Sequence, residues 1–345
     1  MISIAGTLSK AWMYQVLGVV FDRDYYFDPI WRHAIDCRCN EYAAEKFPGM
    51  GLFYSESNLG RMQYWDKGQV QIGGLQPNMI LGMLLGADLL PADDRDADIT
   101  PGYLAGISPE DLPAPEALLR HDLVRLLDGQ IARIQGEGQL RPIPPFFWDA
   151  SGRATIHGVL TTAQKFYGET LFLDLMTEPH KCLRILDWIA DAYIVLCRHF
   201  AQKARLPITD VHVGECSACM ISSALLQEFV VPTTSRIAGA LGPLRFHSCG
   251  SSTRLLEAIS EIERLQSVDL GGETSIRRAR EIFGREMSIS IAPLPGDMSA
   301  ESPEPILSWA GRILEENAGG NLAFVYHLEP TYNVETIRAL TEFLS

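Results

Sequence analysis

The stretch LRFHSCGSSTRLLEAISEIERLQSVDL, residues 244–270, contains the unit from which the C-terminal half of this protein is built. The short segment LRFHSC, with apolar Leu244 and Phe246, predicts a strand over residues 244–249. Leucine and isoleucine then recur at helical spacing, with a serine N-cap at position 251 or 252, which predicts a helix over residues 253–265. The next apolar run predicts a strand over residues 267–270. The segment is therefore typical of a strand–helix–strand unit.

The same alternation continues through most of the chain beyond residue 150. Short apolar strands that alternate with amphipathic helices predict parallel strand pairing with helices outside. An open doubly wound sheet, the alternative, usually carries a glycine-rich phosphate loop after its first strand, and the sequence has none there. The pattern therefore predicts an α/β fold, a TIM-type (β/α)8 barrel with an elaborated N-terminal region. The other predicted strands are residues 155–160, 208–215, 287–292 and 322–328, and the other predicted helices are residues 161–167, 178–205, 225–241, 275–283 and 334–344, with one more helix entered by Ser302-Pro303.

Residues 1–345 are predicted to form a single barrel domain, because a (β/α)8 barrel with insertions has about this length. Clear strand–helix units occupy residues 150–345. Residues 1–145 are a divergent N-terminal part, with predicted helices over residues 29–46 and 113–135. A region rich in Gly, Pro and Asp separates these two helices. We expect this part to form loops over the barrel rim or a cap.

The composition excludes several classes of partner. Lysine plus arginine number 29 against 43 aspartate plus glutamate, so the net charge is −14. Such a balance argues against binding to nucleic acid and against an anionic membrane surface. No membrane span and no signal peptide is recognised, and the seven cysteines do not suggest a disulfide framework. A reducing cytoplasm is the expected location, where clustered Cys and His suggest a metal or a reactive thiol.

Residues typical of metal sites recur at the predicted strand ends. In a (β/α)8 barrel, the active site lies at the C-terminal ends of the strands. His247 and Cys249 stand two residues apart at one such end, so their side chains leave the same face of the strand. Imidazole and thiolate are typical zinc ligands. The sequence therefore predicts a metal site at His247 and Cys249.

A third ligand is expected from another strand end, and the chain offers more than one. His327 stands at the end of the last predicted strand. Cys216 and Cys219 form a C-x-x-C just past an earlier strand end. This pair is either a metal or redox pair, or a stretch with small buried thiols. The thiols on the predicted helices, Cys37, Cys39, Cys182 and Cys197, are not expected to take part.

Carboxylates at the same predicted rim are candidates for catalysis. Glu215 is the last residue of a predicted strand and is a candidate metal ligand, general acid/base or substrate contact. Asp269 lies at the end of the next strand but one, and Glu273 follows that strand. Of these, Glu215 and Asp269 are the predicted catalytic residues, and His212 is expected to be structural.

Three segments carry a resemblance to a known family. They are IHGVLTTAQKFYGETLFLDLMTEPHKCLRILDWI (residues 156–189), ECSACMISSALLQEFVVP (residues 215–232) and FHSCGSSTRLLEAISEI (residues 246–262). Each resembles a segment of the uroporphyrinogen decarboxylase superfamily, the last through its H-x-C-G. The resemblance covers roughly residues 150–345, and the first 140 residues match poorly. It implies a TIM barrel.

The departures from that family separate two branches. The arginine-rich R-Q-A-G-R-Y motif of true decarboxylases is absent, and Arg61 in GRMQY is no substitute. His247 and Cys249 instead match the H-x-C of zinc-dependent corrinoid:thiol methyltransferases. The family's third ligand, a cysteine near the C-terminus, is missing, and His327 is the nearest coordinating residue to that position. The predicted metal ligands are therefore His247, Cys249 and His327.

The resemblance implies a function and its co-substrates. It implies a zinc-dependent methyltransferase that moves a methyl group between a corrinoid, either methylcobalamin or a corrinoid protein, and a small thiol-type acceptor. A uroporphyrinogen-type decarboxylase is the first alternative, and a non-catalytic corrinoid- or metal-binding protein is the second. The expected partners are a corrinoid protein and the methyl acceptor, with no nucleic acid and no membrane. The resemblance leaves a homodimer open.

Overall fold

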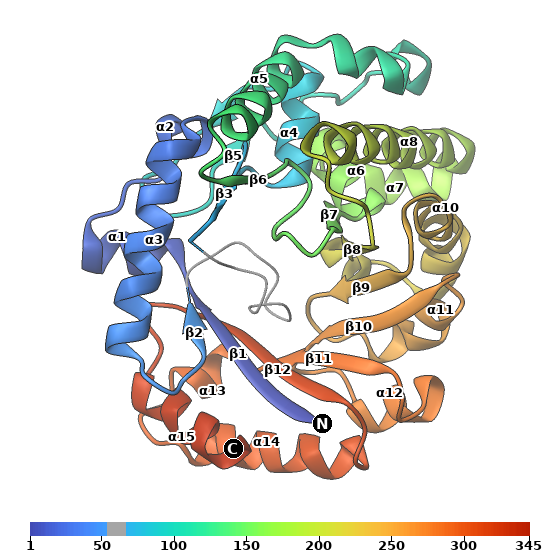
Figure 1. The fold of residues 1–345 in the computed structure, drawn as a ribbon. Helices are drawn as coiled ribbons and strands as arrows, with labels where there is room; N and C mark the ends of the chain where they lie inside the picture. The colour runs from blue at the N-terminus through green and yellow to red at the C-terminus, as the bar shows by residue number, and fades with distance from the viewer. Residues whose placement is uncertain (54–66) are drawn as a thin grey trace.

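The computed structural model describes residues 1–53 and 67–345, and a curled parallel sheet stands at its centre (Figure 1). The strand order is β2-β1-β12-β11-β10-β9-β8-β7, and every neighbouring pair in it is parallel. The two ends of the chain meet in this sheet, because β1 pairs with β12 along its whole length. The strands are β1 (Ile2–Leu8), β2 (Leu52–Phe53), β7 (Arg153–His157), β8 (Asp210–Gly214), β9 (Leu244–Ser248), β10 (Leu265–Gly271), β11 (Ser288–Ala292) and β12 (Leu322–Leu328).

Helices surround the sheet on its outer side (Figure 1). Within the described residues, no helix is long and apolar enough to cross a membrane. The helices of the N-terminal part are α1 (Lys10–Leu17), α2 (Arg23–Phe27), α3 (Pro29–Lys46), α4 (Pro77–Leu84) and α5 (Asp122–Glu137). Those of the C-terminal part are α6 (Val159–Tyr167), α7 (Thr170–Thr177), α8 (Pro179–Ala204), α9 (Ser223–Leu225), α10 (Val231–Leu241), α11 (Leu256–Ser260), α12 (Ile276–Phe283), α13 (Pro295–Met298), α14 (Glu304–Asn317) and α15 (Val334–Leu344).

The edges of the curled sheet are β2 and β7, which do not pair with each other in the described part of the chain. Two short sheets of two strands each accompany the large one. The first pairs β3 (Gln69–Gln71) with β6 (Arg141–Ile143), and the second pairs β4 (Leu89–Leu90) with β5 (Asp98–Ile99). The predicted α/β class and the curled parallel sheet are thus confirmed. The predicted closure of this sheet into an eight-stranded barrel stays a prediction.

The two faces of the curled sheet differ in polarity. Side chains alternate between the faces along each strand. On β8 and β9 the apolar residues Val211, Val213 and Phe246 are fully buried. Their neighbours His212 and Arg245 pair in register and leave the opposite face, which is the inner one. The inner face is therefore polar, although it lies in the middle of the molecule.

Most predicted elements are present, with differences that have local causes. The predicted helix over 225–241 is interrupted by a π-helical turn, Leu226–Val230, just before Pro232, which has no N–H to donate to the preceding turn. The predicted helix over 253–265 is shorter, because β10 already begins at Leu265. Strand β1 was not predicted. Its sequence ISIAGTL is only weakly apolar, and β12 supplies the pairing.

Candidate metal centre

Strand β9 brings His247 and Cys249 to one place at its C-terminal end. His247 lies near the end of the strand and Cys249 follows it, and His247 Nε2 is 3.0 Å from Cys249 Sγ. Ser248 between them points the other way and is buried, with Ser252 Oγ 2.9 Å from its hydroxyl. The side chains of His247 and Cys249 therefore lie on the same side of the strand, as their two-residue spacing predicts.

The turn after β9 approaches β10 too closely for larger residues. Gly250 has a φ of +69°, a left-handed conformation that favours glycine. A Cβ on Gly271 would lie 2.3 Å from the Gly250 carbonyl oxygen. Two glycines thus allow the chain to turn sharply after β9. Cys249 is exposed at the C-terminal ends of the strands, which we call the mouth of the curled sheet.

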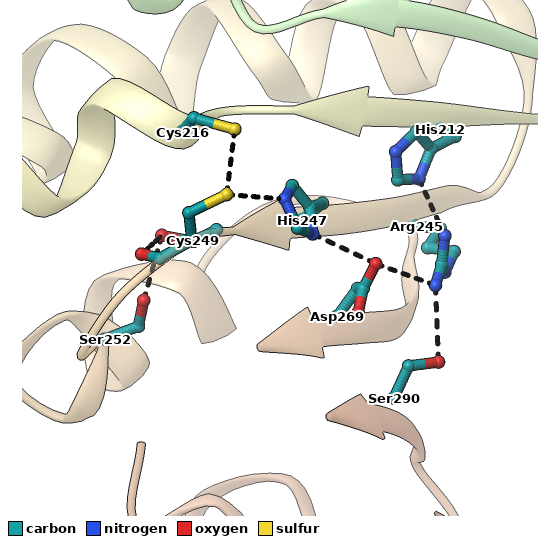
Figure 2. Close-up of polar contacts among 9 residues, drawn as sticks. His212, Cys216, Arg245, His247, Cys249, Ser252, Asp269 and Ser290 are labelled. Carbon is teal, nitrogen blue, oxygen red and sulfur yellow. Dashed lines mark hydrogen bonds and ion pairs between the residues drawn. The ribbon is translucent and has the colours of Figure 1, made fainter. Parts of the chain in front are cut away.

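Cys216 completes a group of three ligand atoms. It begins a 3-10 turn (Cys216–Met220) that is separated from the end of β8 by one residue, and its Sγ lies 3.1 Å from Cys249 Sγ (Figure 2). Gly214 pairs with His247 in register, which sets the segments after the two strands side by side. The ligand atoms of Cys216, His247 and Cys249 all lie within 4.8 Å of one another. Two sulfurs and one imidazole nitrogen are a donor set that fits zinc.

A row of buried polar side chains lies beneath this group on the inner face (Figure 2). Asp269 Oδ2 is 2.9 Å from His247 Nδ1 and 2.9 Å from Arg245 Nη2. The His247 ring is at ion-pair distance from Asp269, although its N–H does not point straight at the oxygen. Arg245 also contacts His212 Nδ1 at 3.2 Å and Ser290 Oγ at 3.3 Å. The row links β8, β9, β10 and β11.

The charges of this row shift its pKa values in opposite directions. Burial alone lowers the pKa of His247, but the Asp269 carboxylate and then Cys216 raise it to about 10. Burial would raise the pKa of Asp269, yet Arg245 and His247 hold it below its usual range. Burial and the Arg245 guanidinium lower the pKa of His212 well below its ordinary value. Asp269 thus lies between Arg245 and His247, the two groups that favour its charged form.

The two thiols of the group differ from each other. The hydrogen bond with Cys216 lowers the pKa of Cys249, although this thiol is exposed only on one side and the protein on its other side acts against the lowering. The same contact and burial raise the pKa of Cys216. A bound cation would favour the thiolate of both residues, because metal coordination needs deprotonated sulfur.

Glu215, a predicted catalytic residue, lies next to this group but its carboxylate faces elsewhere. The side chain is fully buried. Its carboxylate accepts hydrogen bonds at the start of α6, from Thr161 N and Thr161 Oγ1, both at 2.7 Å, and from Leu160 N at 3.2 Å. Burial raises the pKa of Glu215 to about 7 in spite of these donors. These contacts support a structural role, and the predicted catalytic role stays a prediction.

His327, the predicted third ligand, is not in the group of converging atoms. It lies near the end of β12, beside Thr7 of β1, and water reaches it in the mouth of the curled sheet. Partial loss of water around the ring lowers the pKa of His327, and the Asp96 carboxylate raises it. Cys219 is turned aside, with its Sγ 3.2 Å from the Cys216 carbonyl oxygen. A role for His327 as a metal ligand stays a prediction.

The sequence does not single out two of the residues in and beneath this group. The C-x-x-C that contains Cys216 fits small buried thiols as well as a metal or redox pair, and Arg245 is not among the residues predicted for the site. The signal for Arg245 is present, because Arg245, His247 and Cys249 form an R-x-H-x-C in which every second side chain shares one face.

Two comparisons with known proteins match this chain, one by family profile and one by structure. The profile of the uroporphyrinogen decarboxylase (URO-D) family matches residues 156–344, which is more than half of the chain, and the chain belongs to this family. A methyltransferase from Methanosarcina mazei has a similar structure, with a TM-score of 0.65 over 98% of this chain and 93% of that chain. The two are 13% identical, so this likeness shows the fold alone. No curated protein matches the chain. The resemblance to the superfamily is confirmed, and the methyltransferase branch is not.

Proposed function

We propose that this protein is a zinc-dependent methyltransferase, built on a TIM-type (β/α)8 barrel, that moves a methyl group between a corrinoid and a thiol-type acceptor. The observation that carries the proposal is the convergence of Cys216, His247 and Cys249, whose ligand atoms lie within 4.8 Å of one another. Three protein ligands leave a fourth position for a substrate. The structural likeness to a methyltransferase supports the same branch.

Cys216, His247 and Cys249 are the residues that would hold the metal. A bound zinc ion would lower the pKa of an acceptor thiol, which at neutral pH is otherwise only a few per cent thiolate. Cys249 is exposed, so the acceptor can reach the group from the mouth of the curled sheet. His327, the third ligand expected from the sequence resemblance, is the alternative to Cys216.

The chemical step is a substitution at the methyl carbon. The acceptor thiolate forms a sulfur–carbon bond while the cobalt–carbon bond of the methylcorrinoid breaks. The electron pair of that bond remains on cobalt, which passes from Co(III) to Co(I), and the thiol proton goes to solvent. The chain's own contribution is to bind and orient the thiolate at the group formed by Cys216, His247 and Cys249.

A decarboxylase of polycarboxylate substrates is the second candidate, and the family to which the chain belongs favours it. Such a site needs cations that are free to hold substrate carboxylates. Arg245 on the inner face is engaged with Asp269 at 2.9 Å, which makes it a poor candidate for that role. A non-catalytic corrinoid- or metal-binding protein would keep the metal without turnover.

Metal analysis and a methyl-transfer assay test the proposal. Freshly purified protein should contain about one zinc per chain. Methylcobalamin, free or bound to a corrinoid protein, should lose its methyl group to one of a panel of thiols, with a change of the corrinoid spectrum to that of Co(I). Cys249→Ser should lose metal and activity, whereas Cys37→Ser on α3, remote from the site, should keep both. Loss of carboxylate from uroporphyrinogen, with no thiol methylated, would replace this proposal by the second candidate.

A further inference from the structure

We infer that Asp269, anchored by Arg245, is the positioning residue that fixes the His247 ring so that Nε2 is the metal-binding nitrogen. This inference rests on the metal site of the proposed function. It adds a role for the buried row beneath the site, which the reaction itself does not use. The observation behind it is a single carboxylate oxygen that lies 2.9 Å from both His247 Nδ1 and Arg245 Nη2.

The position of Asp269 decides which nitrogen of His247 is available. The two residues pair in register on β9 and β10. An imidazole binds a metal through one nitrogen, and the group at its other nitrogen sets the orientation of the ring. With Asp269 beside Nδ1, Nε2 is left beside Cys249 Sγ, at 3.0 Å. The ring is thus held between a carboxylate on one side and the ligand group on the other (Figure 2).

Arg245 makes this carboxylate a fixed partner. The side chains of Arg245 and Asp269 are only 7% and 11% exposed, so a lone carboxylate here would be costly. The guanidinium has several donors in one plane. Its further contacts, to His212 on β8 and Ser290 on β11, tie the pair to strands on both sides. Asp269 therefore cannot easily turn away from His247.

The same contacts argue against Asp269 as a group that touches substrate. Its Oδ2 atom is shared between two buried partners, and its side chain is mostly covered. Proton transfer to a substrate would require it to release one of these partners. The geometry points to an action through His247.

Cobalt(II) binding to the full chain tests the inference, because its spectrum reports both ligand type and geometry. Wild-type protein should bind cobalt with a thiolate-to-cobalt charge-transfer band. In Asp269→Asn we expect affinity to fall 10- to 100-fold, the usual effect of losing an outer partner of a metal-bound histidine. The ligand-field bands should shift, while the charge-transfer band remains at saturation because both thiols are in place. Asp128→Asn, which removes the carboxylate of a separate His–Asp pair between α5 and α8 (His199 Nε2 to Asp128 Oδ1, 3.0 Å), is the matched control and should bind within about threefold of wild type.

A second variant guards against misfolding. Asp269→Asn leaves Arg245 buried without its counter-charge, which by itself destabilises a protein. The double variant Arg245→Gln/Asp269→Asn removes both charges and should show the same loss of cobalt affinity in folded protein, as judged by circular dichroism. A merely structural role would lower the melting temperature and leave affinity and spectrum unchanged. Wild-type affinity and bands in a folded variant would overturn the inference while the metal site stands. Absence of cobalt binding in wild type would overturn the metal site, and the inference with it.

Discussion

The replacement of Cys216 by serine is the sharpest test of the ligand set. The three converging atoms give the site a nitrogen and two sulfurs, and Cys216 supplies one of those sulfurs. Structural zinc sites with four ligands bind with about 10–16 kcal/mol, which is roughly 3 kcal/mol for each ligand. At about 1.4 kcal/mol per tenfold change, losing one ligand corresponds to a loss of roughly 100-fold or more in affinity. We therefore expect Cys216→Ser to bind zinc at least ~100-fold more weakly than wild type.

His327→Ala is the comparison that decides between the two candidates for the third ligand. His327 lies outside the converging group, so its loss should change zinc affinity by less than about threefold if Cys216 is the ligand. Affinity is measured by competition with a chromophoric chelator, and thermal melting checks that each variant is folded. Wild-type affinity in Cys216→Ser, with a tenfold or larger loss in His327→Ala, would refute the geometric argument. It would support the ligand set predicted from the sequence resemblance.

Three further predictions follow from the same contacts. After removal of metal, a hydroperoxide should join Cys216 and Cys249 in a disulfide, because their sulfurs are 3.1 Å apart. The two thiols lose two hydrogens, and the peroxide becomes water and an alcohol. Peptide mapping should show the disulfide in wild type and in Cys219→Ser but not in Cys216→Ser. The folded-state pKa of Glu215 is raised from 4.5 to about 7, so its contribution to stability is fully present below about pH 4.5 and is lost as the pH rises toward 7. Over this range the unfolding free energy of wild type should fall by about 3 kcal/mol relative to that of Glu215→Gln. Equal pH dependence of the two proteins in urea titrations would contradict this prediction. Chelation should abolish methyl transfer and added zinc should restore it; activity that persists in fully metal-free protein would exclude the proposed role of the metal.

Much of the fold follows from local pattern. The strand–helix alternation beyond residue 150 is readable because buried parallel strands need continuous apolar runs and their covering helices need one apolar face. The bounds of β12 and α15 agree with prediction, since each is a strong pattern of its type. Strand β1 could not be found in the same way, because its pairing partner lies more than 300 residues away in the chain. Strand β1 is stabilised by its pairing with β12 rather than by a strong apolar pattern of its own.

The residues of the candidate metal site also fall into two sets, those placed by the sequence and those placed only by the tertiary structure. The sequence by itself determined that the side chains of His247 and Cys249 lie on one face, because side chains two residues apart in a strand point the same way. Only the tertiary structure decided that Cys216 joins them, that the carboxylate of Glu215 binds the start of α6, and that Asp269 meets His247. These contacts depend on the register between neighbouring parallel strands, and no spacing within one strand encodes that register.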